Sequence, residues 1–179
     1  MEPLNHTLFL WLNASAHPAP AMAWLGVFFA VYAVWIVPIT AGIGWLRGGP
    51  GVRQALLRAA VSALAAWLMN QWIGWLWPQP RPFALGLGHQ LVEHAANFSF
   101  PSNHLALTWA VAFSLLLEPG WRRFGLALAL WGVPIAWARI YVGVHFPLDM
   151  LGAALVALAC ALLVRRLWRS WPTVRPESR

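Results

Sequence analysis

The chain has 179 residues, of which 60% are hydrophobic and 9% charged, and its mean hydropathy is +0.61. These values exclude an ordinary soluble domain and predict a protein with several membrane spans, each of roughly 20 mostly apolar residues. The net charge of +7 rests on arginine alone, and the arginines form no stripe of the kind that binds nucleic acid. The many tryptophans fit two interfacial belts, and the single cysteine, Cys160, falls inside a predicted span and excludes an intramolecular disulfide.

The N-terminal part of the chain predicts one helix outside the spans and then a first span. Residues 1–20 carry apolar side chains such as Leu4 and Leu8 at helical spacing, and we expect an interfacial or re-entrant helix there. The start lacks the basic residues of a cleaved signal peptide, so we expect this segment to be retained. The first span covers about residues 21–45 and is expected to kink at Pro38.

The middle of the chain predicts two spans separated by a long outer loop. The second span covers about residues 54–77. Residues 78–101 contain prolines and glycines that exclude a span, and within this loop residues 90–96 are expected to make one or two helical turns. The third span, 102–117, is short, about 24 Å at the helical rise, so its first residues are expected close to the hydrocarbon boundary.

The C-terminal part predicts two more spans and a basic tail. The fourth span covers about residues 124–140, and the fifth runs from Pro147, a residue suited to the first position of a helix, to about Val164. Residues 165–179 form the tail. The predicted fold is all-α: a single integral-membrane domain over residues 1–179, with five transmembrane spans and an N-terminal interfacial or re-entrant helix.

The arginines divide sharply between the two faces of this topology. All but two fall on one face, which the positive-inside rule makes cytoplasmic, so the N-terminus is expected outside and the C-terminus inside. The arginines of the inner face are Arg47, Arg53, Arg58, Arg122, Arg123, Arg165, Arg166, Arg169, Arg175 and Arg179. The six histidines all fall at or near the outer face.

The two exceptions, Arg81 and Arg139, stand beside apolar span ends on the outer face. Either one alone is explained by snorkelling, or by an ion pair with Glu93 or Asp149. Together, and with the histidines on the same face, they indicate a binding site for an anion.

A short polar segment, Phe100-Pro101-Ser102-Asn103-His104, stands where the outer loop turns into the third span. Ser102 falls at the N-cap position, where the free backbone N–H groups and the positive end of the helix dipole make a site for an anion. Alternatively, Ser102 only caps the helix and His104 is an ordinary interfacial histidine.

His145 and Asp149 stand at the start of the fifth span. A carboxylate four residues after a histidine can accept the N–H of one ring nitrogen, which leaves the other nitrogen free as a nucleophile or base. Alternatively, Asp149, the only aspartate, merely complements the helix dipole.

Carboxylates are too scarce for the usual magnesium or two-metal phosphoryl-transfer sites. The outer histidines show no zinc-binding spacing such as HExxH, so no metal and no cofactor is expected. Charge stabilisation would then come from arginines and from helix-end amides.

These residues, in this order, resemble the three signature motifs of the type 2 phosphatidic acid phosphatase superfamily. Arg81-Pro82 matches the first motif, Pro101-Ser102-Asn103-His104 the second, and Arg139 with His145 and Asp149 the third. The segment PxPRPF followed by SFPSNH is most similar to bacterial undecaprenyl-diphosphate phosphatases linked to bacitracin resistance. Two positions depart from the family pattern: Gly74 stands where a lysine is common, and Ala138 where a serine is usual.

The resemblance implies a role for each matched residue. His145 would attack phosphorus and form a phosphohistidine, Asp149 would orient it, and His104 would protonate the leaving lipid phosphate and then activate water. The phosphoryl oxygens would be held by Arg81, Ser102, Asn103 and Arg139. Glu93 and His94 are secondary candidates, for a second phosphate or for gating.

The resemblance also implies a function and a location. The expected protein is a metal-independent phosphatase of the bacterial inner membrane that converts undecaprenyl diphosphate to undecaprenyl phosphate on the extracytoplasmic face, which supports recycling of the cell-wall lipid carrier. Phosphatidic acid, phosphatidylglycerol phosphate and lipid A 1-phosphate are alternative substrates. A non-catalytic transporter or export subunit is an alternative of another class, but the polar residues gather at one face and not near the midplane.

Overall fold

The computed structural model describes residues 2–170, and this part of the chain is all-α, as predicted. Short 3₁₀ and π segments join the helices. The α-helices are α1 (Glu2–Leu12), α2 (Pro20–Val27), α3 (Ile36–Arg47), α4 (Pro50–Leu76), α5 (Asn103–Leu116), α6 (Arg122–Tyr141) and α7 (Pro147–Ser170).

Within residues 2–170, four helical stretches are long and apolar enough to cross a membrane, as expected of a multi-pass membrane protein. They are Pro20–Arg47, Pro50–Leu76, Pro119–Tyr141 and Pro147–Ser170. The third predicted span is instead the shorter apolar helix α5, with 14 residues. At the helical rise it is about 21 Å long, less than the roughly 30 Å of a bilayer core.

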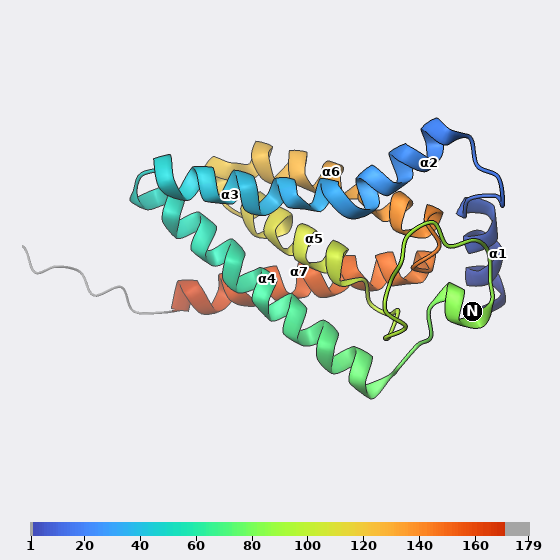
Figure 1. Cartoon of the computed structure of the whole chain (residues 1–179). Helices are drawn as coiled ribbons and strands as arrows, with labels where there is room; N and C mark the ends of the chain where they lie inside the picture. Colours follow the sequence, from blue (N-terminus) through green and yellow to red (C-terminus); the bar gives the residue numbers. More distant parts are fainter. Residues whose placement is uncertain (1, 171–179) are drawn as a thin grey trace, which may run out of the picture.

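The short helix α5 lies at the centre of the bundle, where it packs against α4, α6 and α7 (Figure 1). Small side chains permit this close packing, as is usual between membrane helices. Ala106 and Ala110 are fully buried in the core. Gly125 of α6 faces the backbone of α5 at Leu116, with no room for a Cβ atom. The N-terminal end of α5 is therefore held firmly in the middle of one end of the molecule.

The first long helical stretch is irregular between α2 and α3, where a π segment, Phe28–Tyr32, is followed by a 3₁₀ segment, Ala33–Trp35. The ribbon bends there (Figure 1). The kink was expected at Pro38, but the irregular segment precedes it, because a proline removes the N–H that would bond one turn earlier. Carbonyls of this segment accept bonds from α6, including one from the Trp131 indole to Ala33 O at 3.0 Å.

The outer loop, 78–101, differs from the prediction in its local structure. Residues 90–96 form no helical turn, and the loop has a 3₁₀ turn at Pro82–Leu85 instead. Backbone hydrogen bonds to other segments hold the rest, such as Leu91 N to Val142 O at 3.0 Å. These hydrogen bonds give backbone N–H and C=O groups of the loop their partners without a helix.

Helix α1 lies across the ends of α6 and α7, at the same end of the molecule as the outer loop (Figure 1). Asn13, just after α1, donates to the carbonyls of His89 at 2.9 Å and Tyr141 at 3.0 Å. Asn5 accepts from the backbone N–H of Leu148 at 3.1 Å. The N-terminal helix thus ties the outer loop to the loop between α6 and α7.

Among residues 2–170, the other arginines lie toward the opposite end of the molecule. Arg58 forms an ion pair with Glu118 at 2.7 Å and lies over the ring of Trp168 at 5.5 Å. Helix α7 continues to Ser170, so the first residues of the predicted tail, 165–179, are helical, and the remainder lies outside the described residues.

Candidate active site

One end of the bundle collects the charged and polar residues that the sequence singled out. The outer loop, the N-terminal end of α5 and the loop between α6 and α7 meet there. Arg139, His145 and Asp149 are only 3%, 1% and 3% exposed. Arg81 and Ser102 are also buried. Buried charges in an apolar protein are costly unless they are paired or serve a ligand, so each of these groups needs a partner.

The centre of the site is the pair His145 and Asp149. The His145 Nδ1 atom lies 3.0 Å from Asp149 Oδ2, and the same oxygen accepts the backbone N–H of Phe146 at 2.8 Å. The hydroxyl of Ser99 also donates to it. Pro147 starts α7 two residues before Asp149, which turns the carboxylate back toward the imidazole. The carboxylate therefore holds the ring in one orientation.

The other ring nitrogen of His145 faces Arg81. Arg81 Nη1 lies 3.1 Å from His145 Nε2. A guanidinium only donates hydrogen bonds, so Nε2 is the acceptor and Nδ1 carries the proton that bonds to Asp149. Burial lowers the pKa of the His145 imidazole well below its usual range, and the charges of Arg139 and Arg81 act in the same direction. The ring is thus neutral at physiological pH, with the lone pair on Nε2.

Arg81 itself is bound on every side of its guanidinium. Nη1 donates to Val144 O at 2.8 Å, and Nη2 to Phe98 O at 3.1 Å. Nε and Nη2 both donate to the Asn97 side-chain oxygen, at 3.1 and 2.9 Å. Burial lowers the pKa of Arg81 to about 10, against the opposing attraction of Asp149, so the group stays charged at neutral pH.

Arg139, in the last turn of α6, is held much less completely. Its Nη1 donates to Ala30 O of the π segment at 3.2 Å. Its Nε and Nη2 are buried without a hydrogen-bond partner among residues 2–170. Unpaired buried donors cost about 1–3 kcal/mol each, and more when charged, a cost that a bound anion would remove.

Ser102 occupies the N-cap position of α5, but its hydroxyl does not make the capping bond. The alternative that Ser102 only caps the helix is therefore wrong. Within the described residues its Oγ is buried and has no partner. The first backbone N–H groups of α5 also lack partners within the helix, as in any helix. The hydroxyl and these amides form a second group of donors for which residues 2–170 provide no hydrogen-bond acceptor.

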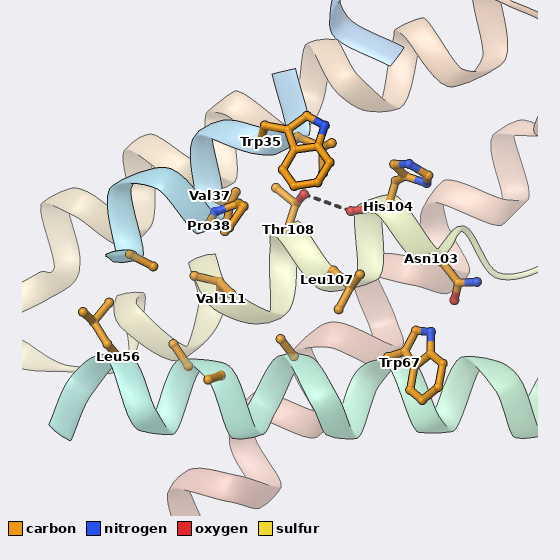
Figure 2. Close-up of a pocket in the computed structure, with 15 residues that line it drawn as sticks. Trp35, Val37, Pro38, Leu56, Trp67, Asn103, His104, Leu107, Thr108 and Val111 are labelled. Carbon is orange, nitrogen blue, oxygen red and sulfur yellow. Dashed lines mark hydrogen bonds between the residues drawn. The ribbon is translucent and has the colours of Figure 1, made fainter. Parts of the chain in front are cut away.

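His104 and Asn103 leave α5 in different directions (Figure 2). His104 is half-buried, and a positive charge on its ring would add slightly to the lowering of the pKa of His145. The Asn103 side chain instead points to α4, where its Oδ1 accepts from Asn70 at 3.2 Å and its Nδ2 donates to Gln71 at 3.3 Å. Only the backbone amide of Asn103 is left for a phosphate.

The two secondary candidates lie in the outer loop. The His94 ring is perpendicular to the His145 ring, with 6.3 Å between centroids, and burial lowers the pKa of His94. Glu93 is exposed and lines, with Gln90 and His94, an open hollow of about 470 Å³. The structure therefore brings His94 to the site and leaves Glu93 at its rim.

The sequence interpretation missed three polar residues that support the site. Ser99 bonds to Asp149, Asn97 bonds to Arg81, and Asn70 bonds to Asn103. Ser99 and Asn97 carried no signal beyond their place near the second motif. Asn70 and its neighbour Gln71 are adjacent amides within an apolar span, and polar residues in such a position could have indicated a supporting role in the site.

The departure at Gly74 has a structural explanation. A Cβ atom at this position would lie 2.4 Å from the ring of Phe98. The glycine thus lets Phe98 pack directly on α4, and the carbonyl of Phe98 binds Arg81. Ala138, the other departure, is fully buried beside Ala30 and Val142. Neither position reaches toward a phosphate.

Comparison with known proteins agrees with this geometry. Residues 55–172 match the model of the PAP2 superfamily. The chain belongs to this superfamily and is a membrane lipid phosphatase of the PAP2 type, which confirms the resemblance seen in its motifs.

Two relatives and one solved structure are especially similar. "Putative undecaprenyl-diphosphatase YbjG" of Escherichia coli (strain K12) is 38% identical over 95% of this chain and 85% of its own length. "Undecaprenyl-diphosphatase BcrC" of Bacillus subtilis (strain 168) is 30% identical over 91% and 83%. The crystal structure of Aquifex aeolicus LpxE has the same fold, with a TM-score of 0.74 at 23% identity over 91% of this chain and 95% of that one.

Proposed function

We propose that this phosphatase hydrolyses undecaprenyl diphosphate to undecaprenyl phosphate and inorganic phosphate through a phosphohistidine on His145. The observation that carries the proposal is the contrast between a fully oriented His145 and the bare donors of Arg139 and Ser102 around it. A neutral nucleophile whose one lone pair accepts a single hydrogen bond, from Arg81, beside donors without a partner suits attack on a phosphate.

The first step is an in-line displacement at the terminal phosphorus. The lone pair on His145 Nε2 forms the new N–P bond, and the bond from phosphorus to the bridging oxygen breaks. His104 gives a proton to that oxygen as undecaprenyl phosphate leaves. Arg81 Nη1, which now bonds to Nε2, transfers its hydrogen bond to a phosphoryl oxygen as the substrate enters.

The second step hydrolyses the phosphohistidine. His104, now neutral, takes a proton from water, and the water oxygen forms a bond to phosphorus as the N–P bond breaks. Inorganic phosphate is released and His145 returns to its neutral form. Asp149 keeps the Nδ1–H proton in place in both steps, through the 3.0 Å contact.

The protein supplies the positive charge that phosphoryl transfer requires. Arg81, Arg139, the Ser102 hydroxyl and the backbone amide of Asn103 hold the three transferred oxygens. This arrangement requires no metal. His94, whose ring lies 6.3 Å from that of His145, and Glu93 at the rim are secondary candidates, for the second phosphate of a diphosphate or for gating.

The orientation in the membrane follows from the arginine distribution. We place the end with Arg81 and Arg139 at the extracytoplasmic face of a bacterial inner membrane, because the remaining arginines of residues 2–170 lie toward the other end. With α5 counted as a short fifth span, the N-terminus is outside and the C-terminus inside. Helix α1 then lies at the outer interface.

A lipid panel tests the proposal. Purified wild type is expected to release phosphate fastest from undecaprenyl diphosphate when compared with phosphatidic acid, phosphatidylglycerol phosphate and lipid A 1-phosphate. His145→Ala and His104→Ala are expected to lose nearly all release, and EDTA is expected to leave the wild type active. Full activity of His145→Ala, or inactivation by EDTA, would contradict the mechanism, and a faster rate on another lipid would reassign the substrate.

A further inference from the structure

Helix α1 has two faces, which differ in what they contact. The exposed face carries Leu4 and Trp11, which are 65% and 81% exposed. The other face carries Asn5 and His6, both half-buried, and the fully buried Phe9. A helix at a membrane surface normally turns its polar side chains to water. The two polar side chains on the inner face of α1 therefore require another explanation.

The inner face of α1 contacts Phe146, the residue that follows the proposed nucleophile. The His6 ring stacks on the Phe146 ring, with 5.1 Å between centroids and 25° between planes. The Phe9 ring meets the same ring edge-on at 5.3 Å. Aromatic rings favour such stacked and edge-on arrangements. Phe146 is 5% exposed, so its side chain cannot turn without separating from α1.

The backbone of Phe146 in turn holds the pair His145 and Asp149. The Phe146 N–H donates to Asp149 Oδ2 at 2.8 Å, and this oxygen lies 3.0 Å from His145 Nδ1. Because a peptide bond joins Phe146 to His145, a shift of Phe146 would displace the imidazole and the carboxylate contact together. A misplacement of about 1 Å at a reacting group can cost roughly 100-fold in rate.

Asn5 completes the first turn of α7. Pro147 has no N–H, so the N–H of Leu148 is the first backbone donor of that helix. Asn5 Oδ1 accepts it at 3.1 Å, from 143 residues earlier in the chain. An asparagine oxygen is a usual N-cap acceptor, but here another helix supplies it. Asp149 lies in the same turn, so Asn5 fixes the turn from which the carboxylate projects.

The end of α1 is anchored separately, at Asn13. Its Oδ1 accepts the His89 N–H at 2.6 Å, and its Nδ2 donates to Tyr141 O at 3.0 Å. Gly88 leaves room for this side chain, because a Cβ atom there would collide with Asn13 Oδ1. Helix α1 is thus bonded on one side to Tyr141, before the catalytic segment, and on the other to Leu148, within it.

We propose that α1 is a clamp on the segment 145–149, and that Asn5 and His6 are positioning residues for the nucleophile. The inference rests on the proposed function, in which His145 Nε2 attacks phosphorus. His6 acts through Phe146, and Asn5 acts through the first turn of α7. The donors proposed to bind phosphate lie on α5, on α6 and in the outer loop. The clamp should therefore govern kcat and leave KM unchanged.

Paired substitutions on the inner face of α1 test the clamp. His6→Ala removes the stacked ring, whereas His6→Phe keeps a ring without a titratable nitrogen. Asn5→Ala removes the acceptor for Leu148 N–H, whereas Asn5→Asp keeps one. His17→Ala, at an exposed histidine before α2, is the matched control. Phosphate release from undecaprenyl diphosphate gives kcat and KM, and hydrogen exchange of the Phe146 and Leu148 amides measures how firmly the segment is held.

The two alanine variants are each expected to lower kcat by roughly 10- to 100-fold at unchanged KM. Exchange should become faster at Phe146 in His6→Ala and at Leu148 in Asn5→Ala. Both conservative variants, His6→Phe and Asn5→Asp, should recover most of the rate and of the protection. The control His17→Ala should match wild type in every measurement.

The remaining outcomes count against the clamp. Wild-type kcat in both alanine variants would overturn it, and so would a lower kcat with unchanged exchange. A higher KM at unchanged kcat would assign α1 to substrate binding instead. An equal loss in His6→Phe and His6→Ala would assign the role to the ring nitrogens and not to the stacking. If wild type released phosphate from none of the lipids, the proposed function would fail, and exchange alone would decide whether α1 holds the segment.

Discussion

The two buried arginines of the site are held in opposite ways. Arg81 belongs to a wall made by the outer loop and uses its guanidinium on Val144, Phe98, Asn97 and His145. Arg139 belongs to a wall made by helices, and two of its three guanidinium nitrogens have no partner within residues 2–170. The protein thus pairs the donors of one wall by itself, and under the proposed function the phosphate of the substrate pairs those of the other.

This division gives the two walls different tasks. The loop wall fixes the shape of the site and occupies the His145 lone pair until a substrate arrives. The helix wall, with Arg139 and the Ser102 hydroxyl, has charge and donors without a partner within residues 2–170, and under the proposed function a bound phosphate would satisfy them. Changes in the helix wall should therefore affect catalysis alone, whereas changes in the loop wall should affect both catalysis and folding stability.

The largest effect is expected for Arg139→Ala. Loss of an arginine that stabilises a transferring phosphoryl group lowers kcat by roughly 10³- to 10⁵-fold. The melting temperature should not fall, because the side chain makes one hydrogen bond, to Ala30 O, and its removal also relieves the cost of two buried donors that have no partner within residues 2–170. Arg139→Lys keeps the positive charge but lacks the planar guanidinium that can bind two phosphate oxygens at once, so it should recover only part of the activity. A large fall in melting temperature would show that Arg139 is a structural residue.

Arg81→Ala is expected to reduce both activity and stability. The substitution removes a proposed phosphate ligand and also leaves the carbonyls of Val144 and Phe98 without their donor. A lost partner for a buried polar group costs about 1–3 kcal/mol, so the melting temperature should fall clearly below that of Arg139→Ala. Equal melting temperatures for the two variants would remove the distinction between the walls.

Bound phosphate should stabilise the wild type through the helix wall. A ligand that binds only the folded state adds about 2.7 kcal/mol at a concentration of 100 times its Kd. Thermal melting in detergent with inorganic phosphate or vanadate measures this gain. Arg139→Ala should lose it, and Ser102→Ala should lose part of it. Full stabilisation of Arg139→Ala by phosphate would show that its bare donors do not bind the anion.

The pH dependence should follow the lowered pKa of His145. A lowered pKa keeps the imidazole neutral as the pH falls through its ordinary value near 6.5, so the nucleophile is lost only in more acidic solution. Arg81→Gln removes one of the charges that lower this pKa, which should move the acid limb of kcat/KM to higher pH. The shift should be partial, because burial is the larger cause. A shift to lower pH would contradict the assigned contact.

The smallest effect is expected for Ser99→Ala. Its hydroxyl supplies one of the bonds that hold the Asp149 carboxylate, which keeps its bonds to Phe146 and His145. The loss of one such bond, about 1–2 kcal/mol, corresponds to roughly a tenfold lower kcat. Ser114→Ala, a buried serine in the last turns of α5, is the matched control. A thousandfold loss would place Ser99 among the reacting groups.

The sequence predicted the helices well because each rests on a local run of apolar residues. The helices near residues 54–77, 124–140 and 147–164 all appear, with ends shifted by a few residues. The break near Pro38 and the conformation of residues 78–101 were predicted less well. Both depend on distant partners, such as the bond from Trp131 to Ala33 O and the bond from Leu91 to Val142 O, that local patterns do not show.

The residues of the site were readable from their motifs, but their contacts were not. The residue types and their order in the three motifs identified Arg81, Arg139, His145 and Asp149 as candidate site residues. The missing capping bond of Ser102 and the turn of the Asn103 side chain toward Asn70 depend on how α4 packs beside α5. That packing also decides which donors remain free, so only the structure separates the loop wall from the helix wall.

The most direct test of the account is to trap the phosphoryl group on His145. Wild type is mixed with undecaprenyl diphosphate labelled in its terminal phosphate, quenched rapidly in alkali, and analysed by mass spectrometry for a phosphorylated histidine. The account predicts label on His145 within one turnover, more of it at steady state in a slow His104→Gln variant, and none in His145→Ala. Phosphate release by wild type with no labelled histidine at any time, or label on another residue, would contradict it.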